Sequence, residues 1–512
     1  MLIFKNRKQT HMKNSVKTML TVIAIASLGL VLTHCKKFLD RPPLQASLED
    51  LNQGGLEGQV FGLYGNFLDR NGSYHGFSSI PWFALNSFRG DDAMKGSDAN
   101  DGADWETVYD NFQYQKAHWS ASIYWDQQYN MINKANTVLH TADSLALTDP
   151  ASLINIAEAK FFRALTYFNL VRVFGDVPKI DFKINNPNDA KKPKVPAAQI
   201  WALIDADLAA GVANLPPDWN NASGNSRFPG RLTRYAAMAL AAKAKIYRND
   251  WAGALGLLEQ IINSGKYELL NDYSTLFKVA GENSKESLFE IQAFVGPNGV
   301  PDAGHEYGVE QGVRGSGQWD LGWGWNAPEP GQEASYEAGD KRRTATILYS
   351  GQDDGYGKTV PPFPTVPRLY WNKKVYPEPQ MQSQTGRRQN NWLNHGLIRY
   401  ADVILLAAEA ANELGGPANQ NNAVTWVNMI RNRAGLSNIA FTTQAAMRTI
   451  IKKERRSEFA MEGERFFDLV RWGDAETVLG ARGYTPCHKY YPIPQSAIDF
   501  AGSSILIQNP CW

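Results

Sequence analysis

The sequence predicts a mainly α-helical fold, a scaffold of tetratricopeptide-like helical hairpins that carries two large loop-rich insertions containing short strands. Three observations predict it. Apolar residues recur at helical spacing in long segments, an alanine-rich helix is followed at once by another helix, and two long blocks are rich in glycine and polar residues. The 512 residues are 43% apolar and 20% charged, which is an ordinary globular composition.

Two segments predict the first pair of antiparallel helices. In the segment that begins at Ala197, apolar residues recur every four positions until Pro216 and Pro217 stop the helix. In the segment that begins at Ala157, phenylalanine and leucine side chains share one face, and the helix ends at Gly175.

Two further pairs follow along the chain. Thr233 is placed to cap an alanine-rich helix, whose small side chains allow close contact with the helix that starts at Trp251. A third pair starts at Leu397 and at Asn421, with the glycine pair 415–416 in the turn.

A further helix runs from about Gln444 towards Gly463, and we expect residues 35–512 to form a single body. The hairpin scaffold is expected at about 45–70, 120–282 and 395–475, and the ligand-side insertions at about 71–119 and 283–394. A stretch of more than a hundred residues without structure is unusual in a compact domain. The second insertion should therefore hold short strands and a functional surface.

The N-terminus predicts an export signal with a lipid anchor. Two lysines precede a 14-residue apolar run, which is shorter than the roughly 20 residues of a membrane-spanning helix. The run resembles the signal of bacterial lipoproteins, which predicts a signal peptide at 1–34 and lipid attachment at Cys35. His34 departs from the usual small residue, so a free cysteine after an ordinary signal is the alternative. Translation starts at Met1 or, more naturally, at Met12.

The net charge argues against a nucleic-acid partner, and the cysteine count allows one disulfide. The formal charge is +1, but residues 1–34 hold five cations and no acid, so a chain that starts at Cys35 carries −4. A chain with this net charge lacks the excess of basic residues that is typical of proteins that bind nucleic acid. Lipid on Cys35 leaves Cys487 and Cys511 as an even pair in an exported chain, either joined in a disulfide or as two buried thiols.

Nine motifs occur in one order along nearly the whole chain. They are CKKFLDRPPL, WDQQYNMINKANTVL, EAKFFRALTYFNLVRVFGDVP, GRLTRYAAMALAAKAKIY, NSKESLFEIQ, RYADVILLAAEAANELG, VNMIRNRAGL, EFAMEGERFFDLVRWG and YYPIPQSAID. With these motifs the chain resembles the SusD/RagB family, outer-membrane lipoproteins of Bacteroidetes-type bacteria that work with TonB-dependent transporters.

The resemblance implies a SusD-like helical scaffold, capture of a nutrient at the cell surface, a lid-like seat on a SusC-like TonB-dependent transporter, and no catalysis. Together with the signal, it predicts a lipid-anchored protein exposed on the outer membrane, with an oligosaccharide or polysaccharide ligand and no cofactor. Ligand loops vary within the family, so no ligand residue is transferred by motif.

Ten charged residues of these motifs are interpreted as helix-end charges and ion pairs that lock the hairpins together. They are Arg399, Asp402, Arg431, Arg433, Arg455, Glu458, Glu464, Arg465, Asp468 and Arg471.

The stretch SGQWDLGWGWNAPEP is expected to be a shaped loop, because glycine and proline punctuate it. Side chains two residues apart point to the same side of an extended chain, so Trp323 and Trp325 would form a stacking platform about 7 Å wide. We expect at least one indole, with Trp319 as the third, to contact a sugar, and Asp320 and Asn326 to bond its hydroxyls. Alternatively, the indoles pin the loop to the scaffold or face the transporter.

The family resemblance places the first insertion beside the ligand surface, where it is expected to supply the opposing wall of the site. Its candidates are Trp82, Trp105, Tyr109, Arg89 and Asp92, accompanied by the acids Asp98, Asp101 and Asp104. The alternative is a solvated acidic loop around buried aromatic residues.

Metal and enzyme chemistry have weak support in the sequence. The acids from Asp98 onward fail the EF-hand register, because Tyr109 stands at the twelfth position where a glutamate is required. An irregular structural calcium site, there or at Asp353 and Asp354, is the alternative to no metal. The chain holds no His/Cys cluster with metal spacing and no G-x-S-x-G motif.

We therefore predict a non-enzymatic surface lipoprotein that binds an oligosaccharide through aromatic-lined loops and delivers it to a partner transporter. Affinity should be micromolar or poorer, since the ligand has to be released onward. The alternatives are a peptide-uptake protein of the same family, a glycoside hydrolase, which needs only two carboxylates across a cleft, and a transporter lid without a ligand.

Overall fold

The computed structural model describes residues 54–68, 77–220, 223–224, 226, 228–293, 307–382 and 391–512. The predicted signal peptide, lipid attachment at Cys35 and start at Met1 or Met12 lie outside these residues. All elements named below belong to one compact unit, Gln45–Trp219 with Pro229–Trp512. Among the helices in these ranges, none combines the length and the apolar character needed to cross a membrane.

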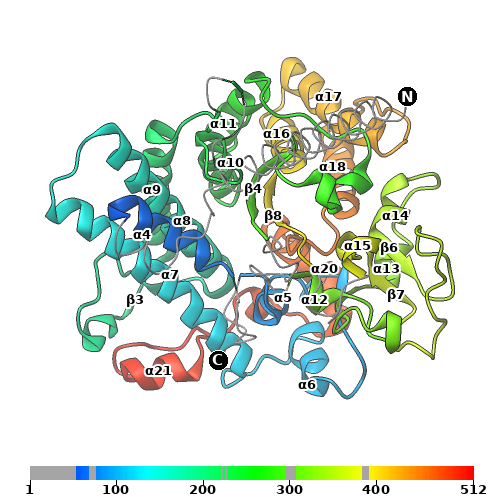
Figure 1. The fold of residues 1–512 in the computed structure, drawn as a ribbon, viewed down its shortest axis with the longest axis horizontal. Coiled ribbons are helices and arrows are strands. Elements are labelled where there is room, and N and C mark those ends of the chain that lie inside the picture. The colour runs from blue at the N-terminus through cyan, green and yellow to red at the C-terminus, as the bar shows by residue number, and fades with distance from the viewer. Residues whose placement is uncertain are drawn as a thin grey trace, which may run out of the picture. The chain divides into compact units, whose positions relative to one another are not determined.

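The fold is mainly α-helical, which confirms the predicted class. The scaffold helices are α4 (Gly55–Gly65), α7 (Trp119–Ser144), α8 (Pro150–Phe174), α9 (Ala197–Asn214), α10 (Arg234–Ile246), α11 (Trp251–Asn263), α16 (Tyr400–Leu414), α17 (Pro417–Arg433) and α18 (Gln444–Glu458). From α7 to α11 each helix packs on the next, α11 packs on α16, and α16 packs on both α17 and α18 (Figure 1). This series of neighbouring contacts is a hairpin array.

The helix ends follow from local sequence signals. The carboxylate of Asp149 accepts hydrogen bonds from the backbone N–H groups of Ala151 and Ser152 and caps α8, which therefore begins seven residues before the predicted start. The helix ends at Gly175, whose φ of +74° suits glycine. Thr233 precedes α10 as predicted, but its hydroxyl lies 3.2 Å from the hydroxyl of Tyr267 and forms no cap.

Short elements lie between α8 and α9, in and beside the insertions, and in the C-terminal region. In chain order they are α5 (Ile80–Asn86), β1 (Ala93–Gly96), α6 (Ala103–Trp105), β2 (Val177–Pro178), β3 (Lys194–Val195), β4 (Ser287–Ile291), α12 (Tyr307–Gln311), β5 (Trp325–Pro328), α13 (Pro330–Glu333), α14 (Lys341–Thr346), β6 (Ile347–Tyr349), β7 (Tyr370–Asn372), α15 (Pro379–Gln382), β8 (His395–Arg399), α19 (Arg465–Trp472), α20 (Ala475–Leu479) and α21 (Gln495–Ala501). The strands form antiparallel pairs, β1 with β5, β2 with β3, β4 with β8 and β6 with β7.

The β1–β5 pair joins the two insertions to each other. Gly96 lies opposite Trp325 in this ladder, and Ala93 lies opposite Pro328. The ladder continues at one end, where the backbone N–H of Ser97 donates to the carbonyl of Gly324 at 2.5 Å. Segments far apart in sequence are therefore held side by side by backbone hydrogen bonds.

The second insertion has a small hydrophobic core of its own, which periodicity did not predict. Strands β6 and β7 contribute Leu348 and Trp371 to it. The full set is Val313, Trp319, Leu321, Leu348, Val360, Val366, Trp371 and Tyr376, all buried. This core makes the insertion a packed structure rather than an open loop.

The predicted ion pairs between hairpins are confirmed. Glu458 of α18 is fully buried and its carboxylate contacts the guanidinium groups of Arg399 (2.6 Å), Arg342 (3.5 Å) and Arg433. The other residues of the predicted set also form ion pairs: Arg455 with Asp402 and Asp468, Arg431 with Glu454, Arg471 with Glu409, Arg465 with Asp91, and Glu464 with Arg172 and Lys243. These contacts tie α16, α17 and α18 to each other and to the insertions.

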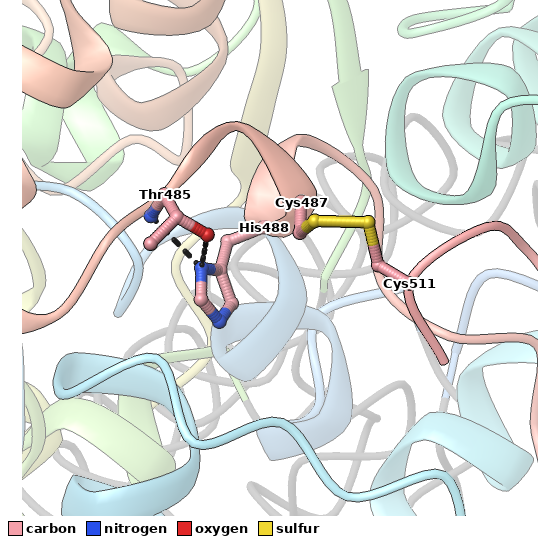
Figure 2. The surroundings of a disulfide bond; sticks show 4 residues. All are labelled: Thr485, Cys487, His488 and Cys511. Carbon is pink, nitrogen blue, oxygen red and sulfur yellow. Dashed lines mark hydrogen bonds between the residues drawn. A yellow bond between two sulfur atoms is a disulfide. The ribbon is translucent and has the colours of Figure 1, made fainter.

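Cys487 and Cys511 form a disulfide, with their Cα atoms 5.9 Å apart (Figure 2). The turn at Cys487 is fixed locally, because the backbone N–H of Thr485 donates to Nδ1 of His488 at 2.9 Å. The bond closes the loop that follows α20 and contains α21.

Glutamine in place of Glu337 is expected to weaken the acid sensitivity of the fold. Hydrogen bonds from Arg431 lower the pKa of Glu337 to about 2, although burial opposes the shift, and Lys453 adds to it. The stabilisation is fully present above the ordinary pKa of 4.5 and is lost as pH falls towards 2. About a third of the side chain is exposed, so we expect about 1 kcal/mol or less. The urea midpoints of the unaltered protein and of Glu337→Gln, each at pH 6 and at pH 2.5, measure this contribution. An equal loss of stability in both proteins between pH 6 and pH 2.5 would contradict the prediction.

Candidate functional site

A cluster of aromatic rings lies where the two insertions meet. Trp105 is at its centre, with ring centroids of Trp119 and Trp325 both 5.2 Å away and that of Tyr109 5.6 Å away. The indole of Trp325 is in turn stacked on Phe88 at 6.2 Å. The β1–β5 ladder holds this cluster together, because it places Trp325 beside the first insertion.

Two indoles at this junction are accessible to a ligand. Trp119 is 44% exposed and Trp323 is 38% exposed, whereas Trp105 and Trp325 are buried. Trp119 is the first residue of α7, and Nδ1 of the preceding His118 accepts from the backbone N–H of Ser120 as a cap.

An acidic loop lies between the two exposed indoles. Its residue Asp104 approaches His118 beside Trp119, with 3.4 Å between Oδ2 and Nε2. At the other end, Arg314 lies over the ring of Trp323 at 5.7 Å and binds Asp98 at 2.7 Å and Asp101. We call this surface the Trp119–Trp323 face. It comprises Trp119, Asp104, Asp101, Asn100, Asp98, Arg314 and Trp323.

The acidic loop is held in shape by its own hydrogen bonds. The carboxylate of Asp98 accepts from the backbone N–H groups of Asn100 and Asp101. Burial raises the pKa of Asp98, but these bonds and the charge of Arg314 outweigh it and lower the pKa below its usual value. Gly102 has a φ of +55°, and a Cβ there would lie 2.7 Å from the indole of Trp325 and 2.9 Å from that of Trp105. The loop can lie this close to the rings only with glycine at that position.

The Asp104, His118 and Ser120 side chains form a chain of contacts that resembles a hydrolytic relay. Nδ1 of His118 lies 2.7 Å from Oγ of Ser120, and that hydroxyl lies 2.5 Å from the hydroxyl of Tyr109. Burial lowers the pKa of His118, and Asp104 opposes this shift only in part. Ser120 is fully buried, so a substrate has no access to its oxygen. We therefore assign the three side chains a structural role.

The predicted platform of Trp323 and Trp325 is not formed. Gly324 between them has a φ of +74°, so this stretch is not extended and the two side chains do not share one side. Trp325 is buried in the aromatic cluster, and Trp319 is buried in the small core of the second insertion. Of Trp319, Trp323 and Trp325, only Trp323 is exposed to solvent.

The two polar residues that were predicted to bond a sugar beside the tryptophans, Asn326 and Asp320, differ in their burial. Asn326 is fully buried, where its amide donates to Gln311 at 2.7 Å and accepts from the hydroxyl of Ser87 at 2.6 Å. This makes Asn326 a structural link between the insertions, contrary to the predicted sugar contact. Asp320 is half-buried, and its backbone pairs with that of Arg314.

The five predicted residues of the opposing wall are buried rather than exposed to a ligand. Trp82 packs edge-on against His395 at 5.1 Å, and Tyr109 is stacked on Tyr491 at 5.7 Å. Trp105 lies in the aromatic cluster described above.

The two charged members of that wall are also structural. Arg89 donates to the carbonyl of Leu85 at 2.6 Å and lies 4.0 Å above the ring of Phe466. Asp92 accepts from the backbone N–H of Met461 at 2.8 Å, and burial raises its pKa to about 6. The prediction that these side chains touch a ligand is wrong, because all five are buried. The sequence could not show this, since a mixture of aromatic and polar residues occurs both in buried loops and in exposed ones.

The acids considered for calcium already have partners. Arg314 lies between Asp98 and Asp101. Asp354 is buried and accepts from the backbone N–H of Tyr356 at 2.7 Å and from the hydroxyl of Tyr376 at 2.8 Å. Within the described ranges, no group of three or more His, Cys, Asp or Glu side chains is placed to hold a metal ion.

Two small cavities border β8 in the scaffold, one on the side of Lys374 and one on the side of Lys243. Arg399 and Glu462 line both, and they pair with each other at 2.8 Å. Lys374 also binds Glu462, at 2.6 Å, and Lys243 binds Asp402 at 3.0 Å. These cavities therefore belong to the ion-pair system that joins the hairpins, and the exposed aromatic face is the better ligand site.

Sequence reasoning missed Trp119. It is the last residue of the predicted first insertion, about 71–119, and no role was predicted for it there. As the first residue of α7 it has no preceding turn to cover it. A tryptophan placed directly after the helix cap, at the end of a loop-rich block, was the available signal.

Comparisons with known proteins agree with the fold. The family model described as "SusD family" matches residues 327–486, and the model described as "Starch-binding associating with outer membrane" matches residues 74–247. The SusD-like protein P2 of Formosa agariphila is 28% identical over 475 residues, with 86% of this chain and 90% of the relative covered.

Solved structures are similar over nearly their whole length. The surface glycan-binding protein A of Bacteroides fluxus has a TM-score of 0.74 and 25% identity, covering 90% of this chain and 99% of its own. A laminarin-binding SusD-like protein has a TM-score of 0.73 and 26% identity, covering 91% and 100%.

Proposed function

Because the chain belongs to the SusD family, we propose that it captures an oligosaccharide on the Trp119–Trp323 face and passes it to a SusC-like TonB-dependent transporter. One observation carries the assignment to this face: two exposed indoles flank a loop of carboxylates and amides. Indoles pack on the apolar C–H faces of sugars, and carboxylates accept hydrogen bonds from sugar hydroxyls. The relatives named above as glycan-binding and laminarin-binding support a glycan as the ligand.

The proposal places the protein on the outer membrane, anchored by lipid on Cys35. The family description that includes association with the outer membrane supports this location. A tether near the transporter raises the local concentration of captured ligand, which compensates for weak binding. The protein acts by binding and release, without catalysis.

Replacing either exposed indole by alanine is expected to weaken glycan binding about 10- to 100-fold, the loss of about 1–3 kcal/mol of stacking and burial. Isothermal titration of the full chain in detergent, with laminarin and with starch, compares the protein with Trp119→Ala and Trp323→Ala. The control is Phe182→Ala, because Phe182 is as exposed as Trp323, at 37%, and lies outside the face.

The alternatives predict different outcomes in the same titration. Binding to a mixture of peptides but to neither glycan would indicate the peptide-uptake alternative. Release of reducing sugar from laminarin or starch by the protein alone would indicate a hydrolase. Absence of binding to all of these ligands, together with loss of solvent accessibility of Trp119 and Trp323 when the transporter is added, would indicate a transporter lid. Its two indoles would then contact the transporter instead of a ligand.

A further inference from the structure

We propose that the Trp119–Trp323 face selects uncharged glycans and disfavours glycans that carry carboxylate or sulfate groups. The inference rests on the proposed function and adds the chemical class of the ligand. It follows from the charges that surround the two indoles and from the partners that these charges already have.

The accessible charge of the face is negative. The carboxylates of Asp98, Asp101 and Asp104 have exposed fractions of 29%, 30% and 57%. Against these three stands one guanidinium, that of Arg314, which leaves a formal charge of −2. Burial keeps the pKa of His118 below its usual value, so this ring adds no charge at neutral pH.

The residues that flank the face do not change this balance. Glu106, beyond Asp104, and Lys116, before His118, are both exposed and cancel each other. Counting this pair with the face therefore leaves its formal charge at −2.

Arg314 is not available to clamp an anion. Its two terminal nitrogens bind Asp98 and Asp101, and one of them also donates to the hydroxyl of Ser97 at 2.7 Å. An incoming sulfate or uronate would have to displace carboxylates that the loop holds in place through Gly102 and the bonds to Asp98.

Two further cations near the loop are turned into the protein. Arg368 donates to the carbonyls of Ser97 and Gly96, each at 2.6 Å. Lys95 is 1% exposed and donates to the carbonyl of Asp98 at 3.0 Å. Neither side chain presents its charge to a ligand on the face, so they stabilise the loop rather than attract an anion.

Uncharged sugars meet a different situation at the same groups. A sugar hydroxyl donates a hydrogen bond to a carboxylate, and such charge-assisted bonds are stronger than neutral ones. A sulfate or carboxylate on the same ring has no proton to donate and repels the loop at short range. The indoles contribute equally to both kinds of sugar, so the acids decide between them.

The test uses one glycan backbone in two charge states. The full chain in detergent is titrated with laminarin and with sulfated laminarin, and with starch and sulfated starch as a second pair, at low ionic strength. We expect each uncharged glycan that binds to do so at least 10-fold more tightly than its anionic counterpart. The preference should shrink as salt is added, because salt screens the repulsion between exposed charges.

A double variant tests which acids produce the preference. Asp98→Asn with Asp101→Asn releases Arg314 from both carboxylates and is expected to reduce the preference for the uncharged glycan at least 5-fold. Glu268→Gln, which removes an exposed acid outside the face, should leave it unchanged. If the double variant does not fold, the salt dependence of the unaltered protein and the variant Asp104→Asn provide the same comparison.

Two failures can be told apart. Equal or tighter binding of the anionic glycans, still lost in Trp119→Ala and Trp323→Ala, would overturn the charge selection and leave the proposed function standing. Absence of binding to every glycan would overturn the proposed function itself.

Discussion

Glutamine in place of Glu458 is expected to destabilise the protein by about 3–5 kcal/mol, because it removes the only negative charge shared by three buried guanidinium groups within the described residues. Glu458 is fully buried, and Arg342, Arg399 and Arg433 are each at most 8% exposed. Burial alone would raise the pKa of Glu458, but the charges of the three arginines hold it well below the usual range. Glutamine keeps the shape of the side chain, so the change isolates the lost charge.

The urea midpoint at pH 7 measures this effect. The matched control is Glu268→Gln, since Glu268 forms an ion pair with Lys285 in which both side chains are about two-thirds exposed. That pair should contribute less than about 1 kcal/mol. A loss below about 1 kcal/mol for Glu458→Gln as well would mean that the remaining partner of Arg433 and Arg399, Glu286, suffices to balance them.

Alanine in place of Trp325 is expected to cost about 3–5 kcal/mol of stability, while alanine in place of Trp323 costs less than about 1 kcal/mol. Trp325 is 6% exposed and contacts Trp105, Phe88 and Gly102, so its removal leaves a cavity between the two insertions. Trp323 is 38% exposed, and Arg314 lies over its ring at 5.7 Å.

Thermal and urea unfolding of the two variants provide the comparison, and each variant serves as the control for the other. They stand two residues apart and remove the same side chain, so composition and net charge are identical. Equal losses of stability would show that Trp325 does not support the junction of the insertions as its burial indicates.

The helical scaffold could be predicted because its signals are local. Helices α9, α10 and α11 follow from apolar spacing, from the run of alanines and from the helix that starts at once at Trp251, and these signals lie within or beside the helix concerned. The ion pairs could be predicted as a class, since so many charges in otherwise apolar helical motifs need partners. Their exact pairing depends on how helices pack and could not be read from the sequence.

The site was predicted less well because it depends on long-range contacts. Which indole of the tryptophan stretch reaches solvent is decided by the φ of Gly324, by the pairing of β1 with β5 and by the small core that encloses Trp319. None of these leaves a periodic pattern in the sequence. Trp119 falls at the end of the predicted first insertion, but no periodic pattern marks its exposure at the first position of α7.

The β1–β5 pairing also orders the steps by which the molecule forms. Arg314 and Ser97 are 217 residues apart, and every contact across the junction closes a loop of similar length. Neighbouring hairpins such as α7–α8 and α10–α11 close much shorter loops and form sooner. A chain that emerges N-terminus first during synthesis therefore builds most of its helical array before Trp325 arrives. Until then Phe88 and Trp105 lack the indole that covers them, and this unfinished junction is the stage of biogenesis most open to aggregation.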